Sequence, residues 1–260
     1  MADLARLRAR LRELDRVVVA FSGGADSAFL AWVANDELGP ERALAVTAVS
    51  PSLAPEEEVA CKELAEAWGL SWQPVFTDEL ANPEYEANAG DRCFHCKSAL
   101  MDALEPIGAG TIVLGVNVDD LGDHRPGQHA AAERGAVFPL VDAGFSKADV
   151  RAASLELGLE TWDKPAAACL ASRVPYGTPV TLSVLREVAA AESGLRALGF
   201  RQLRVRHYGD LARLELPLDE LPAVLEQREA VVAAVRAAGY RYVTLDLDGF
   251  RSGNLNDALG

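Results

Sequence analysis

Short, continuously apolar runs alternate with longer segments of helical periodicity along the first 160 residues of the chain. A continuous apolar run is typical of a strand covered on both faces, whereas apolar residues at every third or fourth position indicate a helix with one buried side. The pattern predicts strands at 17–21, 43–49, 71–76, 111–116 and 137–141, and helices at 4–14, 26–37, 56–69, about 97–104 and 146–158. This alternation predicts an α/β fold built on a doubly wound parallel sheet with right-handed crossovers.

The pattern changes after residue 160. Residues 161–180 are rich in Pro, Ala and Gly and too irregular for a helix or a strand. Beyond them the pattern predicts a helix at 181–198, strands at 201–207 and 211–216, a helix at 219–238 and a strand at 241–247. We therefore expect an N-terminal domain at 1–160, a joint at 161–180 and a smaller α+β domain at 181–260.

A glycine-containing turn follows the first predicted strand and opens the next helix. It consists of Ser22, Gly23, Gly24, Asp26 and Ser27, with an alanine at position 25. The two glycines allow the backbone to approach a ligand closely, and the N–H groups and dipole at the helix start attract an anion. The two serines add hydroxyl donors, and the aspartate is either a helix cap or an organiser of magnesium or of the loop. The loop lacks the GxxxxGK[ST] pattern, so it is not a Walker loop with a phosphate-binding lysine.

The order of strand, SGGADS and helix resembles the PP-loop of the N-type ATP pyrophosphatases. This superfamily includes NAD and GMP synthetases, argininosuccinate synthetase and several thiolation enzymes. The resemblance implies that the loop grips the pyrophosphate of ATP and that AMP is transferred. Asn117, Asp119 and Asp120 follow another predicted strand, and the carboxyl ends of parallel strands are where such sheets bind ligands. The alternative is an ordinary strand–turn–helix unit with glycines for packing.

Composition excludes several classes of function. The chain has 260 residues, half of them apolar, which allows one large or two modest domains. Its net charge of −14 disfavours a broad nucleic-acid surface. The N-terminus is not a signal peptide, and no apolar run reaches membrane length. We therefore expect a cytoplasmic protein without a nucleic-acid or membrane partner, whose four cysteines are more plausible as ligands or nucleophiles than as disulfides.

Three of the cysteines are candidates for chemistry. Cys93 and Cys96 form a CxxC pair, a spacing shared by redox pairs, zinc half-sites and iron–sulfur sites. Cys61 falls on the inward face of its predicted helix and is most simply a buried hydrophobic residue. Cys93, Cys96 and Cys169 remain, and three thiolates suit a cluster with one open iron. Three unrelated thiols are the alternative.

The irregular joint carries Cys169 together with Ser172 and Arg173. A thiol in a loop beside an arginine is a candidate activated nucleophile, and the guanidinium can bind a phosphate or a carboxylate with two hydrogen bonds. Beside an ATP site, this suggests that a substrate carboxylate attacks the α-phosphate and that a sulfur nucleophile then meets the acyl-adenylate.

Basic residues alternate with apolar ones in the smaller domain. Arg204 and Arg206 share one face of the predicted strand at 201–207, and Leu203 and Val205 take the other. Beyond the turn, Arg213 also points away from the core. This arginine-bearing face either receives an anionic substrate or is simply solvated.

Nearly the whole chain resembles the LarE family, whose members are ATP-dependent sulfur transferases that help to build the nickel-pincer nucleotide cofactor of lactate racemase. The resemblance rests on SGGADS, RCFHCK, GVNVDDLGDHRPG, KPAAACLASRVPYGTPVT, RVRHYGDLARLE and LDLDGFRSGNLN. It implies Mg²⁺-ATP and adenylation of a carboxylate of pyridinium-3,5-biscarboxylic acid mononucleotide, with release of pyrophosphate and AMP and conversion of that carboxylate to a thiocarboxylate. It also implies a small-molecule nucleotide as partner and a homo-oligomer, typically a hexamer.

The resemblance also implies roles for individual residues. The SGGADS residues bind the pyrophosphate of ATP, and Asn117 and Arg125 contribute to the same cofactor site from a family-like loop. Arg173, Arg204 and Arg206 match basic positions suited to the phosphate and carboxylates of the substrate, and we group Arg213 with them.

The sulfur source has two family precedents. In some members, the cysteine matching Cys169 surrenders its own sulfur and becomes dehydroalanine. Other members hold a [4Fe-4S] cluster on three cysteines, and its open iron carries an extra sulfide. Because Cys93, Cys96 and Cys169 are all present, we favour the cluster. A tRNA-thiolating enzyme, an ammonia-using ligase of the NAD or GMP synthetase kind and a non-catalytic nucleotide- and metal-binding module remain open as alternatives.

Overall fold

The computed structural model describes residues 2–122, 126–164 and 168–251. The chain forms two compact units. The first comprises Met1–Ser50, Pro55–Glu79 and Cys93–Ala167, and the second comprises Pro51–Ala54, Leu80–Arg92 and Ala168–Gly260. Two short segments of the first half of the chain therefore belong to the second unit, where the carbonyl oxygens of Ser52, Glu86 and Asn88 accept hydrogen bonds from backbone N–H groups between residues 170 and 180.

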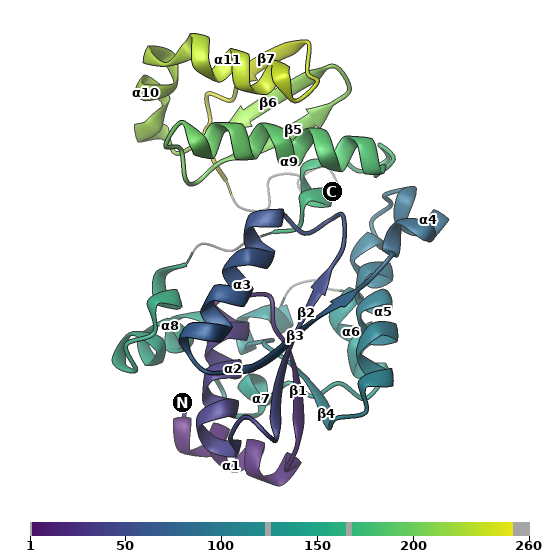
Figure 1. Ribbon diagram of the computed structural model, residues 1–260, viewed down its shortest axis with the longest axis vertical. Helices are drawn as coiled ribbons and strands as arrows, with labels where there is room; N and C mark the ends of the chain where they lie inside the picture. The colour runs from purple at the N-terminus through teal and green to yellow at the C-terminus, as the bar shows by residue number, and fades with distance from the viewer. Residues whose placement is uncertain (1, 123–125, 165–167, 252–260) are drawn as a thin grey trace. The chain divides into compact units, whose positions relative to one another are not determined.

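The first unit is built on a parallel sheet of four strands (Figure 1). Its strands are β1 (Val17–Ala20), β2 (Ala43–Val49), β3 (Ser71–Phe76) and β4 (Thr111–Leu114). They lie in the order β3-β2-β1-β4, so β1 is paired with β2 on one side and β4 on the other. The strand order thus reverses direction at β1, and a crevice for ligands is expected outside its carboxyl end. The predicted α/β class with a parallel sheet is confirmed.

Helices cover both faces of this sheet (Figure 1). Val17 and Val19 of β1 pack into the core on one face, whereas Val18 packs into the core on the other, as the twofold alternation of a strand requires. The first face is covered by α1 (Leu4–Leu14), α2 (Ala25–Leu38), α3 (Pro55–Ala67), α7 (Pro139–Asp142) and α8 (Lys147–Glu156). The second face is covered by α5 (Arg92–Leu104) and α6 (Pro126–Glu133).

The predicted strand at 137–141 is wrong. Val137 makes a single parallel bridge with Val113, and the chain then enters the short helix α7 at Pro139. Proline has no N–H for a strand ladder, but its fixed φ suits the first turn of a helix. The apolar run is buried as expected, but against α1 rather than within the sheet.

The second unit contains a three-stranded sheet in the order β5-β6-β7. The antiparallel hairpin of β5 (Arg204–Tyr208) and β6 (Leu211–Glu215) is followed by β7 (Tyr242–Leu245), which pairs parallel to β6. Its apolar face packs against α9 (Leu182–Ala197), α10 (Leu221–Glu226) and α11 (Arg228–Ala237). The predicted helix at 219–238 is two helices, because Gln227 leaves helical geometry with a ψ of 18°.

The remaining elements are short. They are the helix α4 (Pro83–Glu86) and the 3-10 turns η1 (Glu79–Ala81), η2 (Glu105–Ile107), η3 (Val118–Gly122), η4 (Glu160–Asp163), η5 (Leu170–Arg173) and η6 (Leu218–Glu220). Among the described residues, no helix combines the length and the apolar character that crossing a membrane would need.

Candidate functional site

The glycine loop lies between β1 and α2 and is braced by its two serines. The Ser22 and Ser27 hydroxyls lie 3.0 Å apart, and the Ser27 hydroxyl also accepts the Ser22 backbone N–H at 3.2 Å. The same hydroxyl donates to the Gly24 carbonyl at 3.1 Å. These bonds close the loop into a fixed turn above the carboxyl end of β1.

Glycine is required at two places around this loop. Gly23 has a φ of +68°, and a Cβ at this position would lie 2.8 Å from the Cys61 sulfur. Gly115, just beyond β4, lies so close to α2 that a Cβ there would come within 2.8 Å of the Ser27 nitrogen. Gly24 precedes α2, and no side chain of the described residues caps the first turn of this helix. Its first N–H groups are therefore available to an anion.

Acidic residues gather at the carboxyl ends of β1 and β4. Burial raises the pKa of the Asp26 carboxyl, Asp120 raises that pKa further, and the Asn117 side chain partly opposes the shift. Asp120 is buried; its Oδ1 lies 3.1 Å from Lys147 Nζ, and its Oδ2 accepts the Asn117 backbone N–H at 3.3 Å. The structure therefore places Asn117 beside the glycine loop, as predicted, whereas Arg125 lies outside the described residues.

The cysteines differ in their surroundings. Cys61 is fully buried, and burial raises the pKa of its thiol, so it is the core residue that its spacing predicted. Cys93 and Cys96 lie three residues apart in the first turns of α5, which begins five residues earlier than expected and brings both onto one side of the helix. Cys93 and Cys169 are exposed, Cys96 is partly buried, and none of the four forms a disulfide. Within the described ranges, no three His, Cys, Asp or Glu side chains are grouped to hold a metal ion.

The loop that carries Cys169 is held by Arg173. The Arg173 guanidinium donates to the carbonyl oxygens of Ala168 and Cys169 at 2.6 and 3.1 Å. Its other nitrogens donate to both carboxylate oxygens of Glu192, at 2.8 and 3.0 Å. Glu192 is fully buried on α9 and also accepts the backbone N–H of Val205 in β5 at 3.1 Å. Arg173 therefore fixes the cysteine loop onto α9 and the sheet, and its predicted contact with substrate stays a prediction.

Arg204 and Arg206 are buried, and Arg213 is partly buried. Arg206 is 1% exposed and donates to Glu215 at 2.9 Å and to the Ser172 carbonyl at 2.7 Å. Arg213 donates to the second oxygen of Glu215 at 2.9 Å. Glu215 is fully buried and pairs with both of these cations. The solvated-face interpretation is therefore wrong, since this face forms an internal ion-pair network.

Arg204 differs from its neighbours. It is 7% exposed, yet its guanidinium makes no hydrogen bond or ion pair within the described part of the chain. It lies over the Phe250 ring, 5.1 Å from the centroid. Burial, with Arg173 and Arg206 nearby, lowers its pKa to about 10. A buried cation without a counter-ion is a ready binding point for an anionic ligand.

The segment preceding the CxxC pair is fastened to the cysteine loop within the second unit. The Asn88 amide donates to three carbonyl oxygens between residues 174 and 178. Arg92 is buried and donates to the Asn88 side chain and, at 2.9 Å, to the Ala171 carbonyl. Arg92, the last residue of this segment, therefore binds the loop of η5 within the second unit.

Comparison with known proteins assigns the chain to a family. The NAD synthase family model matches residues 4–86, which include the glycine loop. Over 98% of its length, the chain is 41% identical to the pyridinium-3,5-bisthiocarboxylic acid mononucleotide synthase of Lactiplantibacillus plantarum, of which it covers 94%. The chain belongs to the LarE family. It is also 47% identical to an uncharacterized protein of Synechocystis sp. over 99% of this chain and 98% of that one. The chain is also 25% identical to an uncharacterized protein of Methanocaldococcus jannaschii, over 97% of this chain and 98% of that one.

Sequence analysis of this LarE chain did not predict two buried glutamates of the site. Glu192 and Glu215, which anchor Arg173 and Arg206, were not among the predicted residues. Glu192 carried a readable signal, because it lies on the same apolar stripe of α9 as Leu185, and a charge on such a stripe indicates a buried ion pair. Glu215 carried none, because its partners lie across the hairpin and along its own strand.

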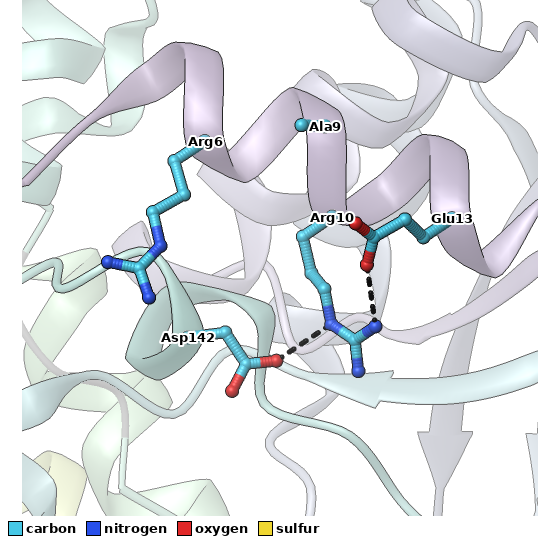
Figure 2. A pocket seen from close by; sticks show the side chains of 5 residues that line it. All are labelled: Arg6, Ala9, Arg10, Glu13 and Asp142. Carbon is cyan, nitrogen blue, oxygen red and sulfur yellow. Dashed lines mark hydrogen bonds and ion pairs between the residues drawn. The ribbon is translucent and has the colours of Figure 1, made fainter.

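A shallow hollow of about 410 Å³ lies elsewhere on this LarE chain, along α1 (Figure 2). It is lined by Arg6, Ala9, Arg10, Glu13 and Asp142. The Arg10 guanidinium points into it but is already bound to Asp142 at 2.9 Å and to Glu13 at 3.0 Å, as Figure 2 shows. None of the predicted site residues lines this hollow, and the surface ion pairs within it add little stability.

Proposed function

We propose that the protein is an ATP-dependent sulfurtransferase acting on pyridinium-3,5-biscarboxylic acid mononucleotide, one carboxylate of which it converts to a thiocarboxylate. The observation that carries this proposal is the 41% identity, over 98% of the chain, with a synthase of the corresponding bisthiocarboxylic acid. The braced glycine loop at the switch point of the parallel sheet supports the use of ATP.

Activation of the carboxylate occurs at the glycine loop of the first unit. A substrate carboxylate oxygen attacks the α-phosphorus of ATP, the bond to the β-phosphate breaks, and pyrophosphate leaves. The uncapped N–H groups of α2 and the Ser22 and Ser27 hydroxyls bind the departing pyrophosphate. Asp26 and Asp120 offer the hard oxygen ligands that Mg²⁺ prefers, and the metal would offset the burial and the Asp120 repulsion that raise the pKa of Asp26.

The anionic substrate is bound by Arg204 in the second unit. This arginine is buried and has no carboxylate partner among the described residues, so the substrate phosphate or a free carboxylate would supply the missing charge. Arg206 and Arg213 face Glu215 instead and hold the sheet on which Arg204 is mounted. Their contribution is therefore to position Arg204.

Sulfur replaces AMP in the second step: a C–S bond forms at the carbonyl carbon, and the C–O bond to AMP breaks. The thiols of Cys93, Cys96 and Cys169 are accessible or partly accessible, and three thiolates are the donor set of a [4Fe-4S] cluster with one open iron. When bound, such a cluster supplies an exchangeable sulfide. In the alternative, the Cys169 thiol displaces AMP, and loss of its Cα proton together with cleavage of its Cβ–Sγ bond then leaves dehydroalanine and the thiocarboxylate.

The test is an anaerobic reaction of the reconstituted full-length protein with Mg²⁺-ATP and the biscarboxylic acid nucleotide. Pyrophosphate release and the exchange of one substrate oxygen for sulfur are followed by mass spectrometry, together with the intact mass of the protein and its optical spectrum. We expect pyrophosphate and thiocarboxylate to form in equal amounts. Absence of both with active ATP binding would refute the proposal.

Variants of single cysteines separate the two sulfur sources. For the cluster, we expect an iron–sulfur absorbance that is lost in Cys93→Ala and a protein mass that is unchanged after turnover. Loss of the elements of H₂S from Cys169 in the wild type would overturn the cluster while leaving the sulfur transfer intact. Cys61→Ala is the matched control, because this thiol is fully buried in the core.

A further inference from the structure

A lysine lies against the glycine loop although the sequence contains no Walker motif. The Nζ atom of Lys164 lies 3.7 Å from the point where a Cβ of Gly23 would be. Lys164 follows η4 and belongs to the first unit together with the loop. It is about 140 residues away in sequence, so local motif reading does not associate it with the loop.

The fold fixes the backbone of Lys164 and leaves its ammonium group adjustable. The Lys164 N–H donates to the Thr161 carbonyl at 3.1 Å, and its own carbonyl accepts from Arg151 at 3.2 Å. The ammonium group pairs with Glu57 Oε2 at 3.0 Å, and both side chains are about a quarter exposed, at 24% and 27%. A partly exposed pair of this kind is weak and can exchange partners.

We propose that Lys164 binds phosphate at the glycine loop. When ATP is bound, its ammonium group breaks its pair with Glu57 and contacts the β- and γ-phosphates instead. This inference rests on the proposed use of ATP by the same loop. The loop otherwise supplies only neutral N–H and hydroxyl donors, whereas the polyphosphate carries several negative charges. An ammonium beside Gly23 places a full positive charge where those phosphates would lie, as the P-loop lysine does in another fold. Glu57 serves as its counter-ion when the nucleotide is absent.

The competing explanation is a purely structural one, in which Lys164 only neutralises Glu57 so that this carboxylate does not repel ATP. The two explanations predict different results for removal of both charges. If Lys164 only neutralises Glu57, the double variant Glu57→Gln, Lys164→Gln regains wild-type affinity. If Lys164 binds phosphate, the double variant stays as weak as Lys164→Gln, because the direct contact is still missing.

The test measures the affinity of the full-length protein and its variants for Mg²⁺-ATP, pyrophosphate and AMP by calorimetry. We expect Lys164→Gln to weaken ATP and pyrophosphate binding by roughly 10- to 100-fold, the effect of one charge-assisted hydrogen bond. AMP binding should change by less than about twofold, because AMP lacks both phosphates that the lysine contacts. Lys164→Arg should recover part of the loss. Lys62→Gln is the matched control, since it removes an equal charge from an exposed pair with Glu66 on α3.

Folding of each variant is checked by tryptophan fluorescence, because all four tryptophans belong to the first unit. Equal loss of ATP and AMP affinity, or full recovery in the double variant, would overturn the inference. So would unchanged ATP affinity in Lys164→Gln. These results leave the proposed sulfur transfer standing, whereas failure of the wild type to bind ATP or pyrophosphate would remove both.

Discussion

Replacing Glu192 by glutamine tests whether the cysteine loop depends on a single buried carboxylate. The change preserves the shape of the side chain on α9 but removes its charge. In the wild type, the carboxylate accepts two hydrogen bonds from Arg173, one from Arg196 and one from the Val205 N–H, at 2.8–3.1 Å. In Glu192→Gln, an NH₂ group replaces one carboxylate oxygen. This group is a donor, so it cannot accept the hydrogen bonds that the arginines donate.

The expected cost follows from the burial of both partners. Glu192 is fully buried and Arg173 is 6% exposed, so the variant leaves a buried guanidinium without its counter-ion. Breaking a buried ion pair on one side costs about 3–5 kcal/mol, which we expect as the loss in free energy of unfolding of the second unit. Arg196 is about a third exposed, so its removal in the control Arg196→Gln should cost less than about 1 kcal/mol.

The assay must report on the second unit, and tryptophan fluorescence cannot, since all tryptophans lie in the first. Hydrogen–deuterium exchange in increasing urea, read by mass spectrometry on peptides from α9 and β5, measures local and global opening there. The Val205 amide should show the largest loss of protection, because its acceptor is Glu192. ATP binding at the glycine loop should be unchanged.

A small effect would refute this reasoning. If Glu192→Gln lowers the free energy of unfolding of the second unit no more than Arg196→Gln does, the carbonyl oxygens of Ala168 and Cys169 are sufficient to hold the Arg173 guanidinium. The carboxylate would then not be what holds the cysteine loop in place.

Three further variants or treatments test other parts of the structure. Gly23→Ala should cost about 1–3 kcal/mol, because it adds strain at positive φ and a clash with Cys61, and urea unfolding followed by tryptophan fluorescence checks this. Arg204→Met should stabilise the second unit by roughly 1–3 kcal/mol at neutral pH while weakening substrate binding, since the charged arginine is unfavourably buried. The pKa of Arg204 in the folded state, about 10, lies below its value in the unfolded state, so the stability gained by Arg204→Met should shrink as the pH rises through 10. Hydrogen–deuterium exchange measured at neutral pH and above pH 10 checks this. Iodoacetamide should label Cys93 and Cys169 in the native protein and Cys61 only after unfolding, as peptide mass spectrometry would show.

Much of the fold could be predicted because the sheet of the first unit is buried on both faces. Continuous apolar runs such as 43–49 leave few alternatives to a central strand, and the predicted strand is confirmed there. The run at 137–141 is equally apolar, but Pro139 cannot donate to a ladder, so its burial is achieved by a helix. Apolar character predicted that this segment is buried, while the proline decided its conformation.

The glycine loop could be predicted from the sequence because its function depends on local backbone conformation and on hydroxyl groups within the same few residues. The arginine sites were not readable to the same degree, because the partner of a charge is set by tertiary structure. Arg204 and Arg206 lie two residues apart on one face of β5 and have the same chemistry. Only the structure distinguishes Arg206, which is bound to Glu215, from Arg204, which has no such partner in the described residues. Lys164 was missed for the same reason.

The bonds that shape the cysteine loop are made to its backbone. The Arg173 guanidinium and the Ser172 N–H both donate to the carbonyl oxygen of Cys169, and the carbonyl oxygen of Ser172 accepts a hydrogen bond from Arg206. The conformation of this loop is therefore indifferent to the chemistry at Sγ. Alanine, serine or dehydroalanine at position 169 would occupy the same frame, so the protein can exchange or lose this sulfur without losing the architecture that presents it.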